Sequence, residues 1–225
     1  MSEKQKISVL ISVYIKENPS FLKDAIESVQ NQTLKPSELV LVEDGPLTPE
    51  LYQVLDQLEA ESDIPVKRYP LEHNQGLGLA LRQGVLQCQY DIIARMDTDD
   101  IAVPDRFEKQ VQLMEKDKLD LLGGHIAEFI DNPDEIVSYR RVPTQHADIV
   151  AYQRMRSAFN HMTVMFKKDM VLKAGNYEDG LYMEDDLLWL NMIAAGAKTG
   201  NLDQILCKVR VGAGMFERRG GLRYL

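Results

Sequence analysis

The sequence predicts an α/β fold in which helices cover both faces of a central, mostly parallel, Rossmann-like sheet. The main observation is a rhythm in the first hundred residues. There, an apolar stretch typical of a buried strand alternates four times with an amphipathic, helix-like stretch. The second half has more mixed patterning, which predicts an antiparallel C-terminal addition to the sheet. No repeat, low-complexity segment or linker interrupts the 225 residues, so we expect one domain over residues 1–225.

The composition is ordinary for a globular protein and excludes several classes. Apolar residues make up 44% of the chain and charged residues 27%, and the net charge is −9. An acidic chain argues against binding nucleic acid, which needs a basic face. The cysteines, Cys88 and Cys207, form no CxxC pair, so no zinc or redox motif is indicated and both are expected to be reduced. With no signal-peptide pattern and no apolar stretch of membrane-spanning length, a cytoplasmic protein is expected.

The elements expected in the first half follow from local patterns. Apolar and largely β-branched residues predict buried strands at 7–14, 38–45 and 66–69 and from Ile92 onward. Ser20 is expected to cap the first helix, and Thr48 the second, with Pro49 at its first position. A third helix is expected at 79–87. Because parallel strands end at the same edge of a sheet, the loops at 14–18, 43–45 and 97–100 should lie side by side.

The second half is expected to begin with a helix opened by Pro104. Further helices are expected at 144–156, at 169–174 with Gly175 as its stop, and at 184–195. Strands are expected at 119–130, with a break or bulge at Gly123 and Gly124, at 161–167 and at 204–211. Trp189 and most methionines of this half are expected to lie in the core.

Three carboxylates follow the fourth predicted strand almost at once: Asp97, Asp99 and Asp100. Acids this close repel one another, and burying them without a partner is costly. A hard divalent cation removes that conflict, because Mg²⁺ and Mn²⁺ prefer oxygen ligands and are commonly held by carboxylates together with substrate phosphates. An Asp-rich turn that only caps a helix would look the same, so this stretch alone leaves both interpretations open.

The order of motifs along the chain resembles glycosyltransferase family 2, the nucleotide-sugar transferases of the GT-A fold. The blocks that carry the resemblance are ISVLISVY, LVLVEDG, HNQGLGLALRQG, ARMDTDDIAVPDRFEKQ, FNHMTVMFKK and MEDDLLWLNMIAAG. Together they cover about residues 7–214. They are most similar to bacterial members that build capsular, exopolysaccharide or protein-linked glycans. The resemblance implies a nucleotide-binding half at 1–103, an acceptor-binding half at 104–215 and a tail at 216–225.

The resemblance also implies roles for residues of the first half. The turn after the first strand would approach the nucleotide, and the EDG and NQG blocks would contact its base and ribose. These positions are Ser12, Tyr14, Glu17, Asp44, Asn74 and Gly76. Asp44 would accept a hydrogen bond from the uracil ring, although a turn former beside Gly45 is the structural alternative. Arg82 would reach a phosphate or be a solvated helix residue.

The acidic stretch matches the DxD signature of the family. The resemblance implies that Asp99 is a direct ligand of Mn²⁺ or Mg²⁺ and that Asp97 contacts the ribose, the metal or a metal-bound water. Asp100 is expected to support the loop. The ion would lie across the two phosphates and stabilise the departing diphosphate.

Glu184 and Asp185 match the ED pair of the family, at the start of the last long helix. The implied role of Asp185 is that of general base, with Glu184 in support, because a sugar hydroxyl is a poor nucleophile until its proton is taken. Acids also favour helix N-termini for structural reasons, and Asp186 is a further acid beside them. His161 and Arg210 are expected to face the acceptor or the diphosphate.

The resemblance therefore implies an inverting, metal-dependent transferase that uses a UDP-sugar, with UDP-glucose or UDP-galactose as the expected donor. Its acceptor would be a glycan, glycolipid or glycoprotein. A peripheral contact with the inner face of the membrane and a homo-oligomer are both compatible with the sequence. The tail, with Arg218, Arg219 and Arg223, matches the family's usual C-terminal element poorly, and it is either a flexible, solvated tail or one that has been cut short.

Two other classes of protein fit part of this pattern. A sugar-nucleotide pyrophosphorylase expects a GxGTR-like loop after the first strand, where this chain has YIKENPS, so that class is disfavoured. The non-enzyme alternative is a catalytically idle subunit that binds a UDP-sugar.

Overall fold

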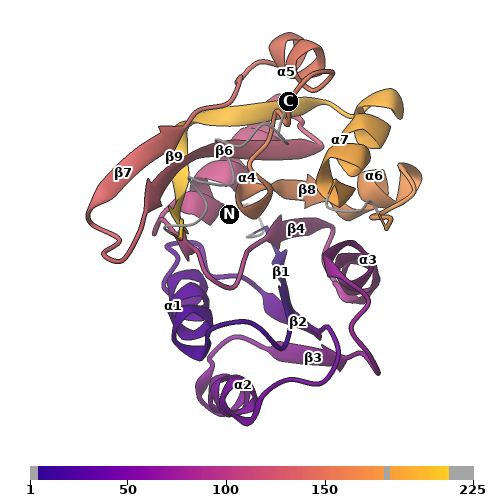
Figure 1. Cartoon of the computed structure of the whole chain (residues 1–225). Coiled ribbons are helices and arrows are strands. Elements are labelled where there is room, and N and C mark those ends of the chain that lie inside the picture. Colours follow the sequence, from indigo (N-terminus) through magenta and orange to yellow (C-terminus); the bar gives the residue numbers. More distant parts are fainter. Residues whose placement is uncertain (1–4, 180–182, 213–225) are drawn as a thin grey trace, which may run out of the picture.

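A computed structural model describes residues 5–179 and 183–212, and across these residues nine strands form one continuous sheet (Figure 1). Its strand order is β3-β2-β1-β4-β8-β6-β9-β5. The strand β7 lies off this path and pairs with β6. The elements of the first half are β1 (Ile7–Val13), α1 (Pro19–Gln30), β2 (Glu38–Glu43), α2 (Pro49–Glu61), β3 (Val66–Pro70), α3 (Leu77–Gln87) and β4 (Ile92–Arg95).

The first half is the predicted parallel sheet. β1 pairs in parallel with β2 and β4, and β2 pairs in parallel with β3. Each strand is followed by a helix that returns the chain to the same starting edge, so the carboxyl ends of β1, β2 and β4 lie together at one edge.

The second half extends this sheet with strands of both directions. Its elements are β5 (Ile101–Ala102), α4 (Arg106–Asp117), β6 (Leu121–Phe129), β7 (Ile136–Arg140), α5 (His146–Tyr152), the 3₁₀ helix η1 (His161–Thr163), β8 (Met165–Lys167), α6 (Lys168–Lys173), α7 (Glu184–Ala194) and β9 (Thr199–Arg210). β8 is antiparallel to both β4 and β6, which joins the two halves of the sheet. β5 and β7 pair antiparallel with β9 and β6, whereas β9 and β6 pair in parallel. The predicted antiparallel addition is confirmed.

Two apolar cores lie on opposite faces of the sheet. On one face, alternate residues of β1 such as Ile7 and Val9 pack with α1, α2 and α4. On the other face, Leu10 and the alternate residues of β2 pack with α3, α5, α6 and α7, with Trp189 fully buried. Because the strands are buried on both sides, their side chains are apolar at nearly every position, as the sequence indicated.

Several predicted boundaries were wrong. Asn18, not Ser20, caps α1, because its side chain accepts a hydrogen bond from the backbone N–H of Ser20 at 2.9 Å. Thr48 caps α2 as predicted. The third helix begins at Leu77, two residues earlier than expected. Residues 161–163 form a 3₁₀ turn rather than the start of a strand.

Other differences concern the second half. The short strands β5 and β7 were not predicted, and β9 begins at Thr199 rather than at 204. The helix expected at 144–156 is limited to His146–Tyr152, and Met155, expected on its inner side, is 88% exposed. Met183 was expected in the core but is exposed. The break expected at Gly123 and Gly124 corresponds to a shift in register between β6 and β9.

The remaining global expectations concern cysteines and membrane spans. Cys88 and Cys207 are both buried free thiols. Among the described residues, the structure contains no helix of the length and apolarity that crossing a bilayer demands.

Candidate functional site

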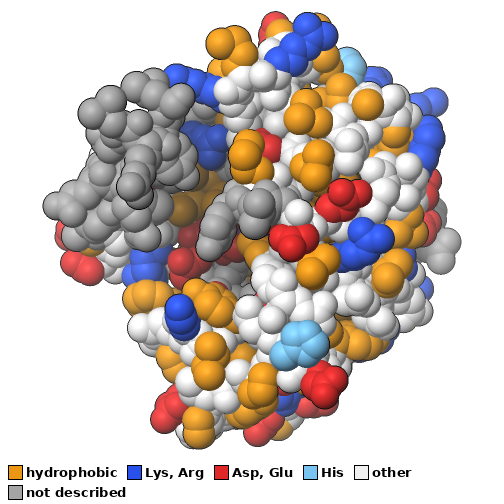
Figure 2. Space-filling model, turned by 45° about the vertical axis from the view of Figure 1, so that its right-hand side comes forward, with side chains coloured by type: hydrophobic (Ala, Val, Ile, Leu, Met, Phe, Trp, Pro, Cys, Tyr) orange, Lys and Arg blue, Asp and Glu red, His pale blue; other side chains and the backbone are white. Residues whose placement is uncertain are grey.

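A hollow of about 480 Å³ lies at the carboxyl ends of β1, β2 and β4. Its lining residues are Ser12, Tyr14, Lys16, Glu17, Asp44, Asn74, Gly76, Leu77, Asp97 and Thr98. The predicted positions Ser12, Tyr14, Glu17, Asp44, Asn74, Gly76 and Asp97 are all among them. Three loops far apart in the sequence therefore meet in one place, as the parallel topology required. In Figure 2, acidic side chains lie in a recess of this face.

The wall formed by residues 74–76 is held in place by Asp44. The Asp44 carboxylate accepts hydrogen bonds from the backbone N–H of Gln75 at 2.7 Å, from that of Gly76 at 3.0 Å and from the Asn74 side chain at 2.9 Å. Gly45 allows this approach, because a Cβ on it would lie 2.6 Å from the backbone nitrogen of Asn74. Asp44 thus builds the wall of the hollow, and about one of the roughly four acceptor positions of its carboxylate remains for a base.

The opposite wall carries the acidic stretch. One carboxylate oxygen from each of Asp97, Asp99 and Asp100 can be chosen so that all three lie within 4.8 Å of one another. Burial, then the charge of Asp97, raises the pKa of Asp99, and burial with the charges of Asp97 and Asp99 raises that of Asp100 well above its usual value. Such shifts mark a site where negative charge lacks compensation, which a cation would supply.

Asp100 has the supporting position that was expected of it. It is buried, and its carboxylate accepts a hydrogen bond from the backbone N–H of Arg210 at 3.0 Å. This contact ties the acidic loop to the end of β9. Asp97 and Asp99 are only partly buried, so they are the members of the cluster that can reach a ligand in the hollow.

Glu17 and Tyr14 complete the acidic surroundings. Burial, opposed by a hydrogen bond from Thr98 and reinforced by the charges of Asp99 and Asp97, raises the pKa of Glu17 to about 7. Burial and then the charge of Glu17 raise the pKa of the Tyr14 phenol. Burial is the main cause of both pKa shifts, and the negative charges around the hollow add to it.

Arg95 is a central residue that sequence reasoning missed. Its guanidinium is buried at the end of β4, where it forms an ion pair with Asp97. Its Nε and Nη1 have no hydrogen-bond partner among the described residues. The charge of Arg95 also lowers the pKa values of Asp99, Asp185 and His161. The sequence feature that could have revealed Arg95 is an arginine at the end of an otherwise apolar strand, two residues before Asp97.

The ED pair lies in the first turn of α7, on the same side of the molecule. A Cβ on Gly78, near the start of α3, would lie 2.9 Å from the Cβ of Glu184, so α7 begins against the helix that follows the 74–76 loop. Burial is the main cause that raises the pKa of the Tyr177 phenol. The charges of Asp185 and Asp97 both raise it further. The two groups of acids therefore share one region, with Arg95 and Tyr177 near both.

Asp185 and Asp186 have different surroundings. Burial, followed by the charge of Asp186, raises the pKa of Asp185 to about 6. The backbone N–H of Asp186 donates to its carboxylate, and Nδ1 of His161 lies 4.0 Å from Oδ2 of Asp185. Asp186 instead accepts a hydrogen bond from the Gln153 side chain at 2.7 Å. Asp185 is thus the acid of this pair without a structural hydrogen bond from a side chain among the described residues.

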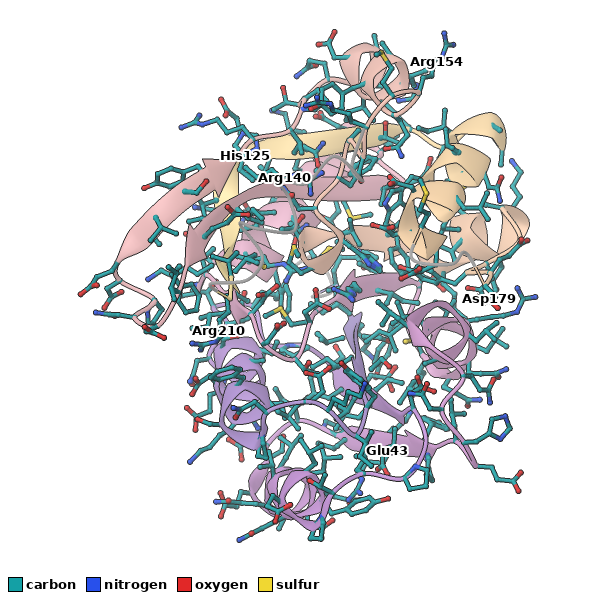
Figure 3. All side chains as sticks on the ribbon, in the orientation of Figure 1. Glu43, His125, Arg140, Arg154, Asp179 and Arg210 are labelled. Carbon is teal, nitrogen blue, oxygen red and sulfur yellow. The ribbon has the colours of Figure 1, made fainter. Side chains whose placement is uncertain are left out.

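Two predicted arginines are engaged elsewhere. Arg82 donates hydrogen bonds from Nη1 to the backbone oxygens of Gly175 at 3.3 Å and Tyr177 at 2.8 Å, so it is bonded to the fold and its expected phosphate contact stays a prediction. The Arg210 guanidinium lies over the rings of Phe21 and Phe129, beside α1 (Figure 3). Its charge also lowers the pKa of Asp99, so the contact expected with the acceptor or the diphosphate stays a prediction. These contacts stabilise the fold. The tail arginines 218, 219 and 223 lie outside the described residues.

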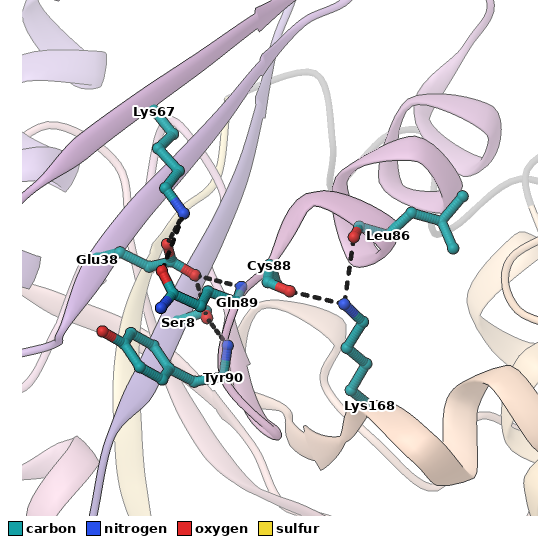
Figure 4. A network of polar contacts seen from close by, with 8 residues as sticks. All are labelled: Ser8, Glu38, Lys67, Leu86, Cys88, Gln89, Tyr90 and Lys168. Carbon is teal, nitrogen blue, oxygen red and sulfur yellow. Dashed lines mark hydrogen bonds and ion pairs between the residues drawn. The ribbon is translucent and has the colours of Figure 1, made fainter.

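A second polar network lies at the opposite edge of the sheet, where β1, β2 and β4 begin (Figure 4). Glu38 is buried there and accepts hydrogen bonds from Ser8 and from the backbone N–H of Gln89, both at 2.6 Å, and it pairs with Lys67 at 2.6 Å. Burial raises the pKa of the nearby Cys88 thiol to about 12, so this cysteine is unreactive. The network ties strand beginnings together and forms no site.

Comparisons with known proteins identify the relatives of the chain. The model of a family described as "Glycosyl transferase family 2" matches residues 8–173. An uncharacterized glycosyltransferase of Haemophilus influenzae is 48% identical over 96% of this chain and 80% of its own length. The amylovoran biosynthesis glycosyltransferase AmsE of Erwinia amylovora is 43% identical over 97% of this chain and 81% of its own. A UDP-Gal:alpha-D-GlcNAc-diphosphoundecaprenol beta-1,3-galactosyltransferase of Escherichia coli is 37% identical over 97% and 79%.

Solved structures share the fold. The mannosyltransferase PcManGT of Pyrobaculum calidifontis, in complex with GDP-Man and Mn²⁺, superposes with a TM-score of 0.71 at 13% identity, over 94% of this chain and 59% of that one. TarS residues 1–349 of S. aureus, in complex with UDP-GlcNAc, has a TM-score of 0.71 at 17% identity, over 93% and 60%. The architecture is thus GT-A-like, as the sequence predicted.

Proposed function

This chain belongs to glycosyltransferase family 2 and is a glycosyltransferase, and we propose that it moves a hexose from a UDP-sugar to a sugar hydroxyl with inversion at the anomeric carbon. The observation that supports this most is the shared placement of two acidic groups. The Asp97–Asp100 cluster lies on one wall of the hollow, and the ED pair starts the helix that packs against α3, which follows the loop of the other wall.

The donor would bind in the hollow with its base and ribose near Ser12, Tyr14, Glu17 and the 74–76 wall. Carboxylate oxygens that repel one another and are partly exposed suit a hard divalent cation. Asp99 and Asp97 would hold Mn²⁺ or Mg²⁺, which when bound offsets the negative charge that develops on the leaving diphosphate. The ion pair with Arg95 orients the Asp97 carboxylate.

Asp185 is the proposed general base. The oxygen of the acceptor hydroxyl forms a bond to the anomeric carbon while the bond from that carbon to UDP breaks, and the hydroxyl proton passes to the carboxylate of Asp185. Attack from the face opposite UDP inverts the configuration. The pKa of about 6 places Asp185 in its ionised form at neutral pH while keeping it more basic than an exposed aspartate.

The names of the relatives indicate which donor and acceptor to expect for this chain. The E. coli relative is named for UDP-Gal and a diphosphoundecaprenol-linked GlcNAc, and the Erwinia relative for amylovoran biosynthesis. On that basis the donor is UDP-galactose or UDP-glucose, and the acceptor is a glycan or glycolipid of bacterial polysaccharide assembly. A lipid-linked acceptor would bring the enzyme from the cytoplasm to the inner face of the membrane as a peripheral protein.

Release of UDP from a panel of UDP-sugars, with Mn²⁺ and a GlcNAc-diphospholipid acceptor, tests the proposal. Transfer should occur with a UDP-hexose, and Asp185→Asn should abolish it while UDP binding, measured by calorimetry, stays within about twofold. Asp148→Asn is the matched control, because Asp148 also lies in the first turn of a helix but away from the hollow. Retained transfer in Asp185→Asn would remove Asp185 from its role. UDP-sugar binding without transfer to any acceptor would favour an idle binding subunit.

A further inference from the structure

Tyr177 is a buried residue whose hydroxyl faces the ED pair through His161. Its phenol and the Nε2 of His161 are 2.9 Å apart. Among the described residues, this is the one hydrogen bond of the Tyr177 hydroxyl. The other ring nitrogen of His161, Nδ1, lies 4.0 Å from Oδ2 of Asp185. Tyr177 thus contacts His161, and His161 in turn faces Asp185, the proposed base.

The rings in this line are held firmly. The Trp189 ring, itself fully buried, packs edge-on against both His161 and Tyr177, with ring centroids 5.8 Å and 6.4 Å apart. This packing prevents the imidazole from rotating away, because a rotated ring would collide with its neighbours.

The backbone of Tyr177 is fastened to α3. Arg82 donates to the Tyr177 backbone oxygen at 2.8 Å, and Asn176, which has a φ of 66°, donates from its side chain to the Arg82 oxygen at 3.0 Å. The Asn176 side chain also accepts from the Tyr177 N–H at 2.8 Å. These reciprocal bonds explain what Arg82 does, and they fix where the Tyr177 hydroxyl points.

Neither ring is charged in this environment. Burial and the charge of Arg95 lower the pKa of His161 well below its usual range, and burial raises the pKa of the Tyr177 phenol. A neutral imidazole carries its proton on one nitrogen only, and a phenol can either donate or accept. The hydrogen bond between them therefore has two arrangements.

Only one arrangement satisfies every group. If Nε2 carried the proton, the lone pair of Nδ1 would face the Asp185 carboxylate, and the phenol hydrogen would lack an acceptor among the described residues. If the phenol donates to Nε2, the proton lies on Nδ1 and points at Asp185. An unpaired buried donor and a lone pair facing a carboxylate both cost free energy, so the second arrangement is favoured.

We propose that Tyr177 is a positioning residue that holds His161 in the Nδ1–H tautomer, so that this N–H orients the carboxylate of Asp185 during transfer. The inference rests on the proposed role of Asp185. His161 keeps its proton throughout: the acceptor proton passes to Asp185, and the imidazole N–H stays bonded to the same carboxylate. The 4.0 Å separation closes to hydrogen-bond length when the acceptor is bound, as catalytic hydrogen bonds commonly do.

The tautomer can be measured without any activity. Long-range ¹H–¹⁵N correlation spectra of the protein labelled in its four histidines distinguish the two tautomers, and His161→Asn assigns the signal. The wild type should show the Nδ1–H form at His161, and Tyr177→Phe should shift it toward Nε2–H. An Nε2–H form in the wild type overturns the proposal, and this spectrum is decisive even if a variant fails to fold.

Kinetics test the consequence. With the UDP-hexose that is transferred fastest, Tyr177→Phe should lower kcat about tenfold, which corresponds to one hydrogen bond, and leave UDP affinity unchanged. In a His161→Asn background the same substitution should have no further effect, because Tyr177 acts through His161. Tyr52→Phe is the matched control, since its hydroxyl accepts from the Leu47 N–H at 3.2 Å outside the hollow, and its kcat should be unchanged.

The outcomes separate the inference from the proposed function. An equal loss from Tyr177→Phe in both backgrounds, or full kcat in Tyr177→Phe, refutes the positioning role. Retained transfer in Asp185→Asn refutes the proposed base instead, whatever the spectrum shows.

Discussion

Replacing Asp44 by Asn tests how the wall of the hollow is built. The Asp44 carboxylate accepts three hydrogen bonds from residues 74–76, at 2.7, 2.9 and 3.0 Å. The isosteric amide has a single oxygen, which can keep the two bonds now made by Oδ2. Its NH₂ group then faces the backbone N–H of Gln75, and that donor is left without an acceptor.

The loss can be estimated from this geometry. A buried N–H that loses a charged acceptor costs roughly 1.5–3 kcal/mol. For a domain of this size each kcal/mol lowers Tm by roughly 2–4 °C, so Asp44→Asn should lower it by roughly 3–12 °C. If binding of the nucleotide must first restore the wall, the same free energy raises the Kd for UDP about tenfold to a hundredfold.

Thermal unfolding and calorimetry with UDP and Mn²⁺ measure the two effects. Glu43→Gln is the matched control, because Glu43 precedes Asp44 and is equally buried but bonds to Arg68 at 2.5 Å instead of to the wall. It should lower Tm and leave the Kd for UDP unchanged. The reasoning is refuted if Asp44→Asn binds UDP within twofold of the wild type, or if Glu43→Gln weakens UDP binding equally.

Three further predictions follow from the acids of the chain. Asp99→Ala should abolish the gain in UDP affinity that Mn²⁺ provides, measured by calorimetry with and without the metal, whereas Asp105→Ala, outside the cluster, should keep it; a preserved gain in Asp99→Ala would exclude Asp99 as a ligand. Because Asp185 acts as a base and its pKa is raised to about 6, kcat/KM should fall as the pH drops through about 6 and level off above it, and a profile that is flat down to pH ~5 would contradict this. Glu38→Gln should destabilise the fold by roughly 2–3 kcal/mol near neutral pH. In the wild type, burial raises the pKa of Glu38, but hydrogen bonds from Lys67, Ser8 and Gln89 outweigh burial and lower it overall. The stability that the ionised form contributes is present above the unfolded carboxyl pKa of ~4.3 and is lost as the pH falls through the lower folded value. The difference in Tm between wild type and variant should therefore shrink in acid, and a constant difference would show that the charge of Glu38 does not matter.

Some structural features could be predicted from the sequence because neighbouring residues cause them. β1 is apolar at every position except Ser8 and Ser12 since it is buried on both faces, and Thr48 followed by Pro49 is a local signal for the start of a helix. Asp97, Asp99 and Asp100 were found because they lie within four residues of sequence. Even so, the local rule chose Ser20 over Asn18 as the cap of α1, since both residue types cap helices and only the backbone conformation at Asn18 decides between them.

Other features depend on partners far along the chain. β5 is two residues long and exists because β9, more than a hundred residues later, pairs with it. Arg82 is of a residue type that commonly binds phosphate, but in this fold the backbone carbonyl of Tyr177 accepts a hydrogen bond from its guanidinium. No pattern around residue 82 contains that information.

The sequence by itself therefore determined the parallel α/β core, the family of the chain and the acids expected to do its chemistry, because strand and helix periodicity and the motif order can be read from neighbouring residues. Only the tertiary structure decided that Asp44 builds a wall, that Arg95 lies beneath the acids and that Tyr177 meets His161 behind Asp185. These contacts join segments separated by tens of residues, and which donor meets which acceptor is settled by packing once the sheet has formed.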